Sequence, residues 1–288
     1  MKTLSLIATT ALLAANTAFA APSTLNFDVY NADGNSFNVN STVVYGDTEA
    51  MVVDAGFTKA DALRIAAKVM DSGKELKTIF ISQADPDYYF GAEVLHGLFP
   101  KAQIITTPAV KAVIEKKLAG KIAFWGPKMG ANAPVNPVVP SAYNKDQITL
   151  DGHTIEIRGT TGELAHRPYL WIADSKAVLG NVAIFGDMHA WTADTQTDES
   201  MNAWTAQLDE MLALNPEIVV PGHMKAGTKL TAATITHTQD YLKTFNEAKK
   251  TSSNSAELIE KMMAAYPAPE APLSLNIGAK VHMGEMKW

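Results

Sequence analysis

Strands and helices alternate along this chain in two similar halves, and this order most constrains its fold. Each half runs through several strand-like segments, then a helix, a strand and a helix. The early runs LNFDVYN, STVVYG and AMVVDAG have the alternation of strands, and Gly46-Asp47 predicts a tight hairpin turn. Residues 59–70 have helical spacing, with Gly73 as a stop. Two mixed sheets packed face to face, with helices outside, suit this α/β order.

The first twenty residues have the pattern of a secretory signal peptide. Lys2 gives a positive start, a short apolar stretch follows, and Ala18 to Ala20 form a small-residue cleavage signal before Ala21. The apolar run is too short to span a bilayer, and no later run is long enough. We therefore expect residues 1–20 to be removed and the protein to be periplasmic or secreted, without a membrane span.

Charge and cysteine content exclude several classes of function. The formal net charge is −6 and no basic stripe is evident, which argues against binding to nucleic acid or anionic lipid. The chain has no cysteine, so disulfides, thiolate nucleophiles and Cys metal sites are excluded. Any metal would have to bind His, Asp or Glu. A small-molecule ligand or substrate is the partner we expect, and the sequence leaves the oligomeric state open.

Two segments stand apart from the regular elements. Residues 122–146 are rich in Gly, Pro and Asn, and we expect a long surface loop there that covers a cleft. Residues 81–91, ISQADPDYYFG, follow a buried strand and lead into a helix. Chemistry is often located on a loop at the end of a strand, so Asp85 and Asp87 are candidate functional groups.

The chain resembles the metallo-β-lactamase superfamily in three segments: VVYGDTEAMVVDAGF, IFISQADPDYYFGAEVL and IVVPGHMKAG. The resemblance implies an αββα sandwich with its active site at one edge, between the sheets. It covers a core of about residues 25–245, and residues 246–288 would form a C-terminal helical extension of a domain that spans 21–288. Enzymes of this superfamily hydrolyse lactams, thioesters, lactones or phosphoesters with one or two metal ions.

The family signature His-x-His-x-Asp-His is mostly absent from the matching positions. Of its four ligand positions, only the aspartate is kept, as Asp87. The final family histidine is matched by His223 of VPGH. The next histidine position falls on Glu163, with His166 nearby, and the bridging aspartate falls on Asn181 or Val182. The other signature positions hold Gln83, Asp85 and Tyr88.

These replacements argue against a dinuclear zinc site. Zinc prefers imidazole nitrogen, and a catalytic site needs three protein ligands and a water. Gln83 offers only a neutral amide oxygen, and Tyr88 would have to ionise. If a single divalent ion (zinc, manganese or calcium) binds, the resemblance points to Asp85, Asp87, Glu163 and His223 as its ligands.

The remaining carboxylates pose an electrostatic problem, because like charges raise one another's pKa. Either a bound cation or a protein cation relieves it, and Arg167 is the candidate for the second, which we favour. No resident cofactor is then required. Asp87 can also play a purely structural role by accepting hydrogen bonds from loop amides.

Aromatic and histidine side chains add candidate ligand contacts. Tyr88 and its aromatic neighbours fit either core packing or the wall of an apolar pocket. In FGDMHAWTAD, His189 and Trp191 follow a buried strand, where the family places groups that face the cleft. We therefore take Tyr88, His189, Trp191 and Arg167 as the candidate substrate-binding residues.

Three hypotheses follow. In the first, an exported homologue has lost its zinc site and binds a small ligand in the old cleft without hydrolysis. In the second, it is a hydrolase of a lactam, lactone or other ester with an altered mononuclear site, Asp87 being the catalytic candidate. In the third, it is an interaction protein that uses its outer faces. The substitutions favour the first over the second, because an activated zinc water depends on imidazole ligands.

Overall fold

The computed structural model of the protein describes residues 24–267 and 271–288. The expected signal peptide at residues 1–20 lies outside the described residues. No helix within the two described ranges is long and apolar enough to cross a membrane.

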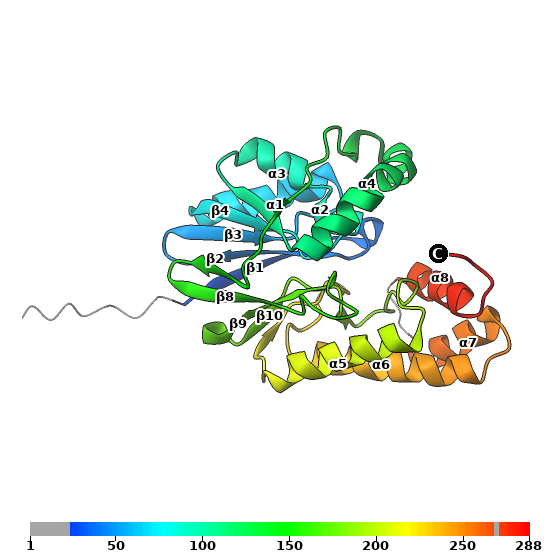
Figure 1. Cartoon of the computed structure of the whole chain (residues 1–288). Helices are drawn as coiled ribbons and strands as arrows, with labels where there is room; N and C mark the ends of the chain where they lie inside the picture. Colours follow the sequence, from blue (N-terminus) through cyan, green and yellow to red (C-terminus); the bar gives the residue numbers. More distant parts are fainter. Residues whose placement is uncertain (1–23, 268–270) are drawn as a thin grey trace, which may run out of the picture.

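Two mixed sheets pack face to face between two layers of helices (Figure 1). The first sheet has the order β1-β2-β3-β4-β5-β6, antiparallel from β1 to β3 and parallel from β3 onward. The expected tight turn at Gly46-Asp47 joins β2 to β3. The strands are β1 (Asn26–Asn31), β2 (Asn40–Tyr45), β3 (Glu49–Val53), β4 (Glu75–Phe80), β5 (Gln103–Thr106) and β6 (Ser141–Ala142).

The second sheet has the order β12-β10-β9-β8-β7, and only β10 and β12 are parallel in it. A separate parallel pair, β11 with β13, carries His223 opposite Phe185. These strands are β7 (Gln147–Leu150), β8 (His153–Arg158), β9 (Tyr169–Ile172), β10 (Ala177–Leu179), β11 (Phe185–Gly186), β12 (Ile218–Val219) and β13 (His223–Met224).

The helices begin and end largely where the sequence signals predict. In α1, Thr58 and Asp61 form a reciprocal capping box, and Gly73 ends the helix at a φ of 67°. Helices α1, α3 and α4 cover the first sheet, and α5 to α7 cover the second (Figure 1). The helices are α1 (Lys59–Ser72), α2 (Pro86–Tyr89), α3 (Ala92–Leu98), α4 (Pro108–Met129), α5 (Asp198–Ala213), α6 (Ala233–Lys250), α7 (Ser255–Ala265) and α8 (Pro272–His282).

The prediction of a long loop over residues 122–146 was wrong in its first part. Helix α4 continues through Gly126 and Pro127 to Met129. A proline near a helix end removes only one hydrogen bond of the last turns, so the helix tolerates it. Beyond α4, a short 3-10 turn (Gly130–Asn132) and β6 leave a shorter irregular segment than expected.

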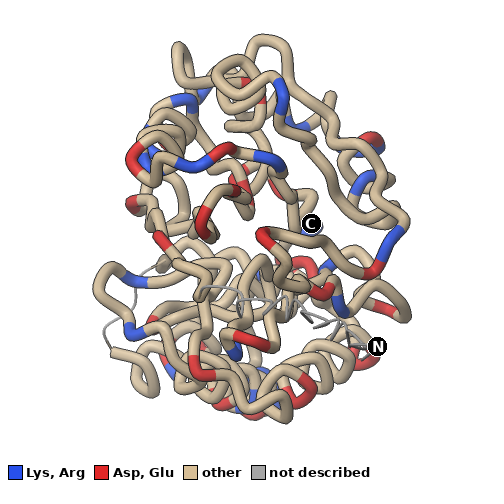
Figure 2. Tube along the Cα trace, turned by 90° about the vertical axis from the view of Figure 1, so that its left-hand side faces the viewer, with Lys and Arg blue, Asp and Glu red and all other residues tan. Residues whose placement is uncertain are grey.

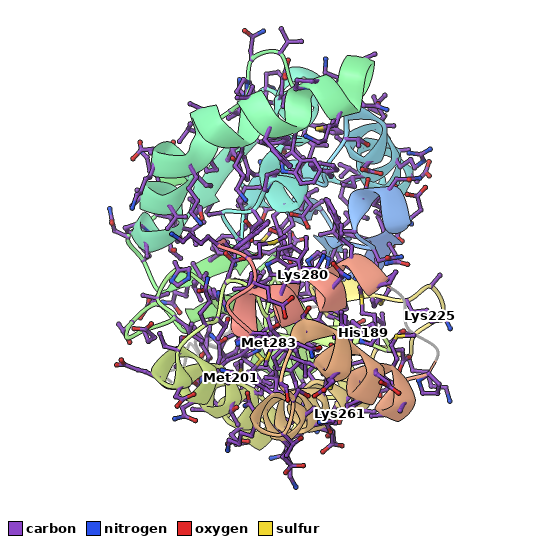
Figure 3. All side chains as sticks on the ribbon, turned by 90° about the vertical axis from the view of Figure 1, so that its right-hand side faces the viewer. His189, Met201, Lys225, Lys261, Lys280 and Met283 are labelled. Atoms are coloured by element: carbon purple, nitrogen blue, oxygen red, sulfur yellow. The ribbon has the colours of Figure 1, made fainter. Side chains whose placement is uncertain are left out.

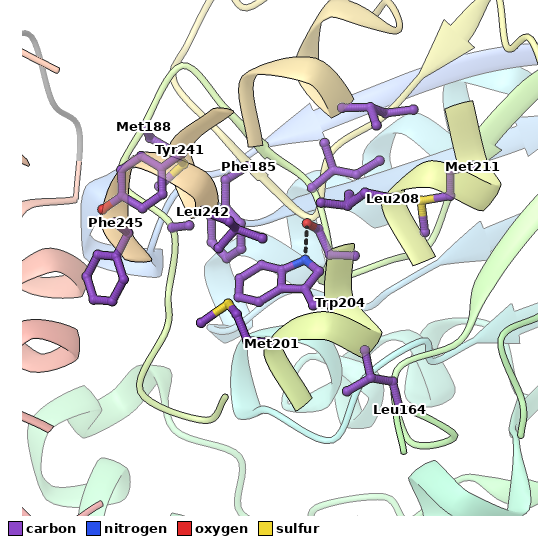
Figure 4. Close-up of a cluster of buried hydrophobic side chains, with 14 of the residues drawn as sticks. Leu164, Phe185, Met188, Met201, Trp204, Leu208, Met211, Tyr241, Leu242 and Phe245 are labelled. Atoms are coloured by element: carbon purple, nitrogen blue, oxygen red, sulfur yellow. Dashed lines mark hydrogen bonds between the residues drawn. The ribbon is translucent and has the colours of Figure 1, made fainter. Parts of the chain in front are cut away.

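Each pair of adjacent layers encloses a hydrophobic cluster. Val44, Met51 and Leu170 belong to the cluster between the two sheets, and Ile65 and Ile79 to the one under α1. The third cluster lies between the second sheet and α5 to α8 (Figure 4). At its centre the Trp204 indole Nε1 donates to the Ala183 carbonyl oxygen at 2.8 Å, so this large side chain is buried with its polar atom satisfied.

Gly91 occupies a position where the backbone leaves no room for a side chain. A Cβ atom on Gly91 would lie 2.0 Å from the Ala55 carbonyl oxygen. This contact holds the start of α3 against the end of β3, where the candidate loop is anchored.

Replacing Gly91 with alanine should therefore destabilise the protein, by about 1–3 kcal/mol as other overpacked positions do. Gly97 in α3 is the matched control, because a Cβ there meets nothing within 4 Å. Gly97→Ala should raise stability by about 0.5–1 kcal/mol through helix propensity. Urea unfolding of the two variants measures both effects, and equal stability of the two would contradict the packing argument.

Candidate functional site

The candidate loop turns into the short helix α2 directly after β4. Pro86 occupies the first helical position, and Asp85 precedes it with an extended backbone. Two backbone hydrogen bonds fix the turn: Ala55 N–H donates to the Tyr88 carbonyl oxygen at 2.7 Å, and Gly91 N–H donates to Gly56 at 3.0 Å. Asp87 and Tyr88 are consequently buried.

Asp87 and His223, the two residues that match the family's metal-ligand positions, lie next to each other. The His223 Nε2 lies 3.5 Å from the Asp87 Oδ2, and both side chains are buried. The other ring nitrogen, Nδ1, lies 2.9 Å from the Phe37 carbonyl oxygen. A carbonyl oxygen only accepts, so Nδ1 carries the proton and the Nε2 lone pair faces Asp87.

Burial decides the protonation state of this pair. Desolvation, followed by the charge of Asp85, raises the pKa of Asp87 well above its ordinary value. Desolvation lowers the pKa of His223 to about 4. Both groups therefore favour the neutral form, and a protonated Asp87 carboxyl is placed to donate toward His223 Nε2. The pair is a carboxylic acid next to a neutral imidazole rather than an ion pair.

Tyr88 fills the space between these groups and the bridging position. Its side chain is fully buried, its hydroxyl lies 3.5 Å from the Asn181 carbonyl oxygen, and its ring centroid lies 5.5 Å from that of His223. Gly222 permits this packing, since a Cβ there would lie 2.5 Å from the Tyr88 hydroxyl. Burial raises the pKa of Tyr88 well above its ordinary value, so the phenol is neutral.

Asp85 lies at the partly exposed edge of the Asp87–His223 cluster, which we call the rim. Its charge is paired by a residue that the sequence did not indicate. The Lys121 ammonium on α4 lies 3.3 Å from the Asp85 carboxylate, and both side chains are partly exposed. The expected partner, Arg167, instead donates to the Thr195 hydroxyl at 2.7 Å and to the Asp194 carbonyl oxygen at 3.2 Å. Arg167 thus hydrogen-bonds to the loop before α5, and the charges of Asp194 and Asp85 also act favourably on its guanidinium. Its role as the balancing cation stays a prediction.

The other candidate residues are dispersed. Glu163 is exposed on the loop before β9. Trp191 donates to the Asp194 carboxylate at 2.7 Å, and Trp288 donates to the same carboxylate at 3.0 Å. The two indoles pack edge to face with centroids 5.0 Å apart, so the C-terminal residue lies beside Trp191. His189 lines a separate cavity, and its ring does not belong to the Asp87–His223 cluster.

Asp54 is a further buried carboxyl that sequence reasoning did not single out. It follows β3 with a φ of 65° and accepts hydrogen bonds from the Ser82 amide at 2.7 Å and the Ser82 hydroxyl at 2.8 Å. Burial raises the pKa of Asp54 to about 7. An aspartate directly after a buried strand was the available signal, in the segment VVDAG.

The residues present do not fit the two-metal centre that the family implies. Within the described ranges, no group of three or more His, Asp or Glu side chains is placed to hold an ion. The Gln83 side-chain oxygen accepts from the Ala84 amide, and the Asn181 side chain bonds to Val220 and Ile184. The Tyr88 phenol is neutral. The Gln83 oxygen and the Asn181 side chain are thus taken up by backbone groups and are not placed as ligands.

Comparison with known families agrees with the fold. The family model described as the metallo-beta-lactamase superfamily matches residues 34–223, about two thirds of the sequence. The chain belongs to this superfamily. No curated protein matches the chain. Family membership carries no activity by itself.

Solved structures with similar folds are distant in sequence. A metallo-beta-lactamase from Pontibacter korlensis is 15% identical with a TM-score of 0.53, covering 79% of this chain and 97% of that one. DIM-1 metallo-beta-lactamase is 16% identical with a TM-score of 0.53, covering 78% and 95%. A metallo-beta-lactamase family protein from Thermus thermophilus is 14% identical with a TM-score of 0.63, covering 90% and 91%. At these identities the likeness shows the fold alone.

His223→Asn should weaken the loss of stability on acidification. Between about pH 6.5 and pH 4 an unfolded histidine takes up a proton that buried His223 refuses, so stability falls as the pH falls. This contribution has a slope of up to about 1.4 kcal/mol per pH unit. Asn keeps an N–H donor for the Phe37 carbonyl oxygen and does not titrate. Urea unfolding across this pH range measures the slope. His96→Asn, exposed on α3, is the control, and an equal slope in wild type and His223→Asn would contradict the assignment.

Asp87→Asn should remove a loss of stability that wild type suffers as the pH rises, the opposite direction to the effect of His223. The raised pKa of Asp87 means that its contribution is favourable at low pH and is lost as the pH rises. An amide imitates the protonated carboxyl, so the variant should match wild type near pH 4 and be the more stable protein at pH 8. Paired urea unfolding at the two pH values tests this. Asp85→Asn, at the partly exposed rim, is the control and should lower the free energy of unfolding by less than about 1 kcal/mol at both pH values. Destabilisation by Asp87→Asn at pH 8 would contradict a protonated Asp87.

Proposed function

We propose that this protein is a non-hydrolytic member of the superfamily that binds a small ligand at the edge where its relatives place their metals. The observation that carries the proposal is the neutral Asp87–His223 pair packed against buried Tyr88. An activated water at a metal needs several basic ligands, and within the described ranges no group of three or more His, Asp or Glu side chains surrounds this pair.

The half-exposed rim provides the groups for ligand contact. The Asp85–Lys121 pair is partly exposed, and His166 is half-buried next to Arg167. Both charge signs are thus available for contact with a ligand. Such a pair suits a polar small molecule. Figure 2 shows Lys, Arg, Asp and Glu positions interspersed along the Cα trace, without one dominant sign.

We further propose that the protein is periplasmic or secreted. The support is the charged start, the short apolar stretch and the Ala18–Ala20 cleavage signal.

A mononuclear hydrolase is the second candidate, and one observation favours it. The His223 Nε2 lone pair and the Asp87 carboxyl converge on one point, which is the start of a metal site. A hard or borderline divalent ion would bind there only by displacing the proton of Asp87 and recruiting further ligands.

Hydrolysis assays separate the two candidates. Chromogenic lactam, lactone, thioester and phosphoester substrates are tested with added zinc, manganese or calcium, using wild type, Asp87→Asn and His223→Asn. We expect no turnover that depends on either residue. Turnover by wild type that falls at least about a hundredfold in both variants would support the hydrolase instead.

Ligand binding at the rim is tested by a thermal-shift screen of small polar metabolites. We expect at least one compound to raise the melting temperature of wild type and to lose most of that shift with Lys121→Met. Lys116→Met is the matched control, since Lys116 is an exposed lysine of the same helix. Hits that respond equally to both substitutions, or no hits at all, would contradict a rim binding site.

A further inference from the structure

One face of helix α4 carries three lysines and an exposed aromatic ring. Lys117, Lys121, Phe124 and Lys128 follow one another at spacings of four, three and four residues, which places them on the same side of a helix. We call these four residues the basic stripe. With the loop that the sequence predicted in this region, no such stripe would form. The continuation of α4 to Met129 creates it.

The charge of α4 is opposite to that of the chain as a whole. The helix holds five lysines and one glutamate, whereas the formal net charge of the chain is −6. Two of the lysines are paired with carboxylates, at 3.5 and 3.3 Å. Lys117 and Lys128 are exposed and form no ion pair with any residue in the described ranges. Two uncompensated cations of the basic stripe therefore face solvent.

Apolar side chains are exposed in the same region. Phe124 exposes 56% of its surface, and Val135 and Val139, in the segment that follows α4, expose 71% and 36%. The Lys128 ammonium lies 3.5 Å from the centre of the Phe124 ring, so the lysine folds back over the exposed ring. Figures 1 and 3 show α4 on the outside of the molecule, at the end opposite α7, where Lys261 is labelled. Cations and apolar groups thus share one outward surface.

We propose that the basic stripe docks the protein on the surface of an anionic phospholipid bilayer. The ammonium groups pair with lipid phosphates, and Phe124 enters the boundary between headgroups and acyl chains. The uncompensated lysines favour an anionic membrane over a neutral one. Val135 and Val139 favour a bilayer over a single-stranded nucleic acid, whose bases stack on aromatic rings and leave aliphatic side chains in water. The inference goes beyond the proposed function and holds whether or not the Asp85–Lys121 rim binds a ligand.

The test is co-sedimentation of the purified protein with vesicles. One set contains phosphatidylcholine alone, and the other also contains about 30% phosphatidylglycerol to supply negative charge. We expect the protein to bind the anionic vesicles and to leave the neutral ones in solution. Binding should be lost at about 1 M salt, where the screening length falls to about 3 Å. Equal binding to both vesicles, or binding that salt does not weaken, would overturn the proposal.

Paired lysine substitutions assign the contact to α4. Lys117→Gln combined with Lys128→Gln should weaken binding to the anionic vesicles at least about tenfold, since each lysine near the surface contributes about fivefold. Lys243→Gln combined with Lys250→Gln removes the same charge from exposed positions of α6, in the opposite outer layer, and should change binding less than about twofold. Equal losses in the two double variants would contradict docking through the basic stripe. The rim pair is left unchanged in both.

Substitution of the exposed ring separates a bilayer from other polyanions. Phe124→Gln keeps the charge and should weaken vesicle binding at least about threefold, because the apolar contact is lost. Phe124→Trp should preserve binding, since an indole suits the membrane interface. The exposure of Phe124 predicts that both variants fold, which urea unfolding verifies. Full vesicle binding by Phe124→Gln would overturn the proposal, as would binding of single-stranded DNA through Lys117 and Lys128 without binding of vesicles.

Discussion

The hydrogen bond from His223 Nδ1 to the Phe37 carbonyl oxygen fixes the centre of the site. It belongs to a backbone join in which Asn40 N–H donates to Gly222 and Met224 N–H donates to Asn38. This join ties the loop before β2 to the turn at β13, which are far apart in the sequence. It places the His223 proton on Nδ1, so the unprotonated Nε2 is the atom that faces Asp87. The remaining features of the site follow from this orientation.

Three carboxyl groups lie close to one another at this edge, and each is accommodated by a different means. Asp54 accepts two hydrogen bonds from Ser82. Asp87 keeps a proton, because burial and the charge of Asp85 oppose its ionisation. Asp85 stays at the rim beside Lys121. Hydrogen bonding, protonation and ion pairing thus relieve the repulsion that a metal ion relieves in a typical member of the fold family, without requiring imidazole ligands.

The sequence predicts those parts of the structure that depend on local signals. The hairpin at Gly46-Asp47 and the capped helix α1 are examples, since their turn and cap residues are neighbours in the chain. The glycine and proline content around residue 126 predicted a loop where α4 continues to Met129. A proline in the last turn destabilises a helix little, so Pro127 does not end it. The Lys121 partner of Asp85 and the contact of Trp288 with Asp194 join residues distant in sequence, and no local pattern announces them. Asp87 and His223 were found because family positions mark them.

Metal stoichiometry distinguishes a neutral Asp87–His223 pair from a metal site. Protein purified without a chelator is analysed for its elements and then titrated with zinc under calorimetry. We expect far less than one bound ion per chain and no saturable zinc binding at the Asp87–His223 pair. About one tightly bound ion per chain, lost in both Asp87→Asn and His223→Asn, would contradict it, because the neutral pair would then be a metal site.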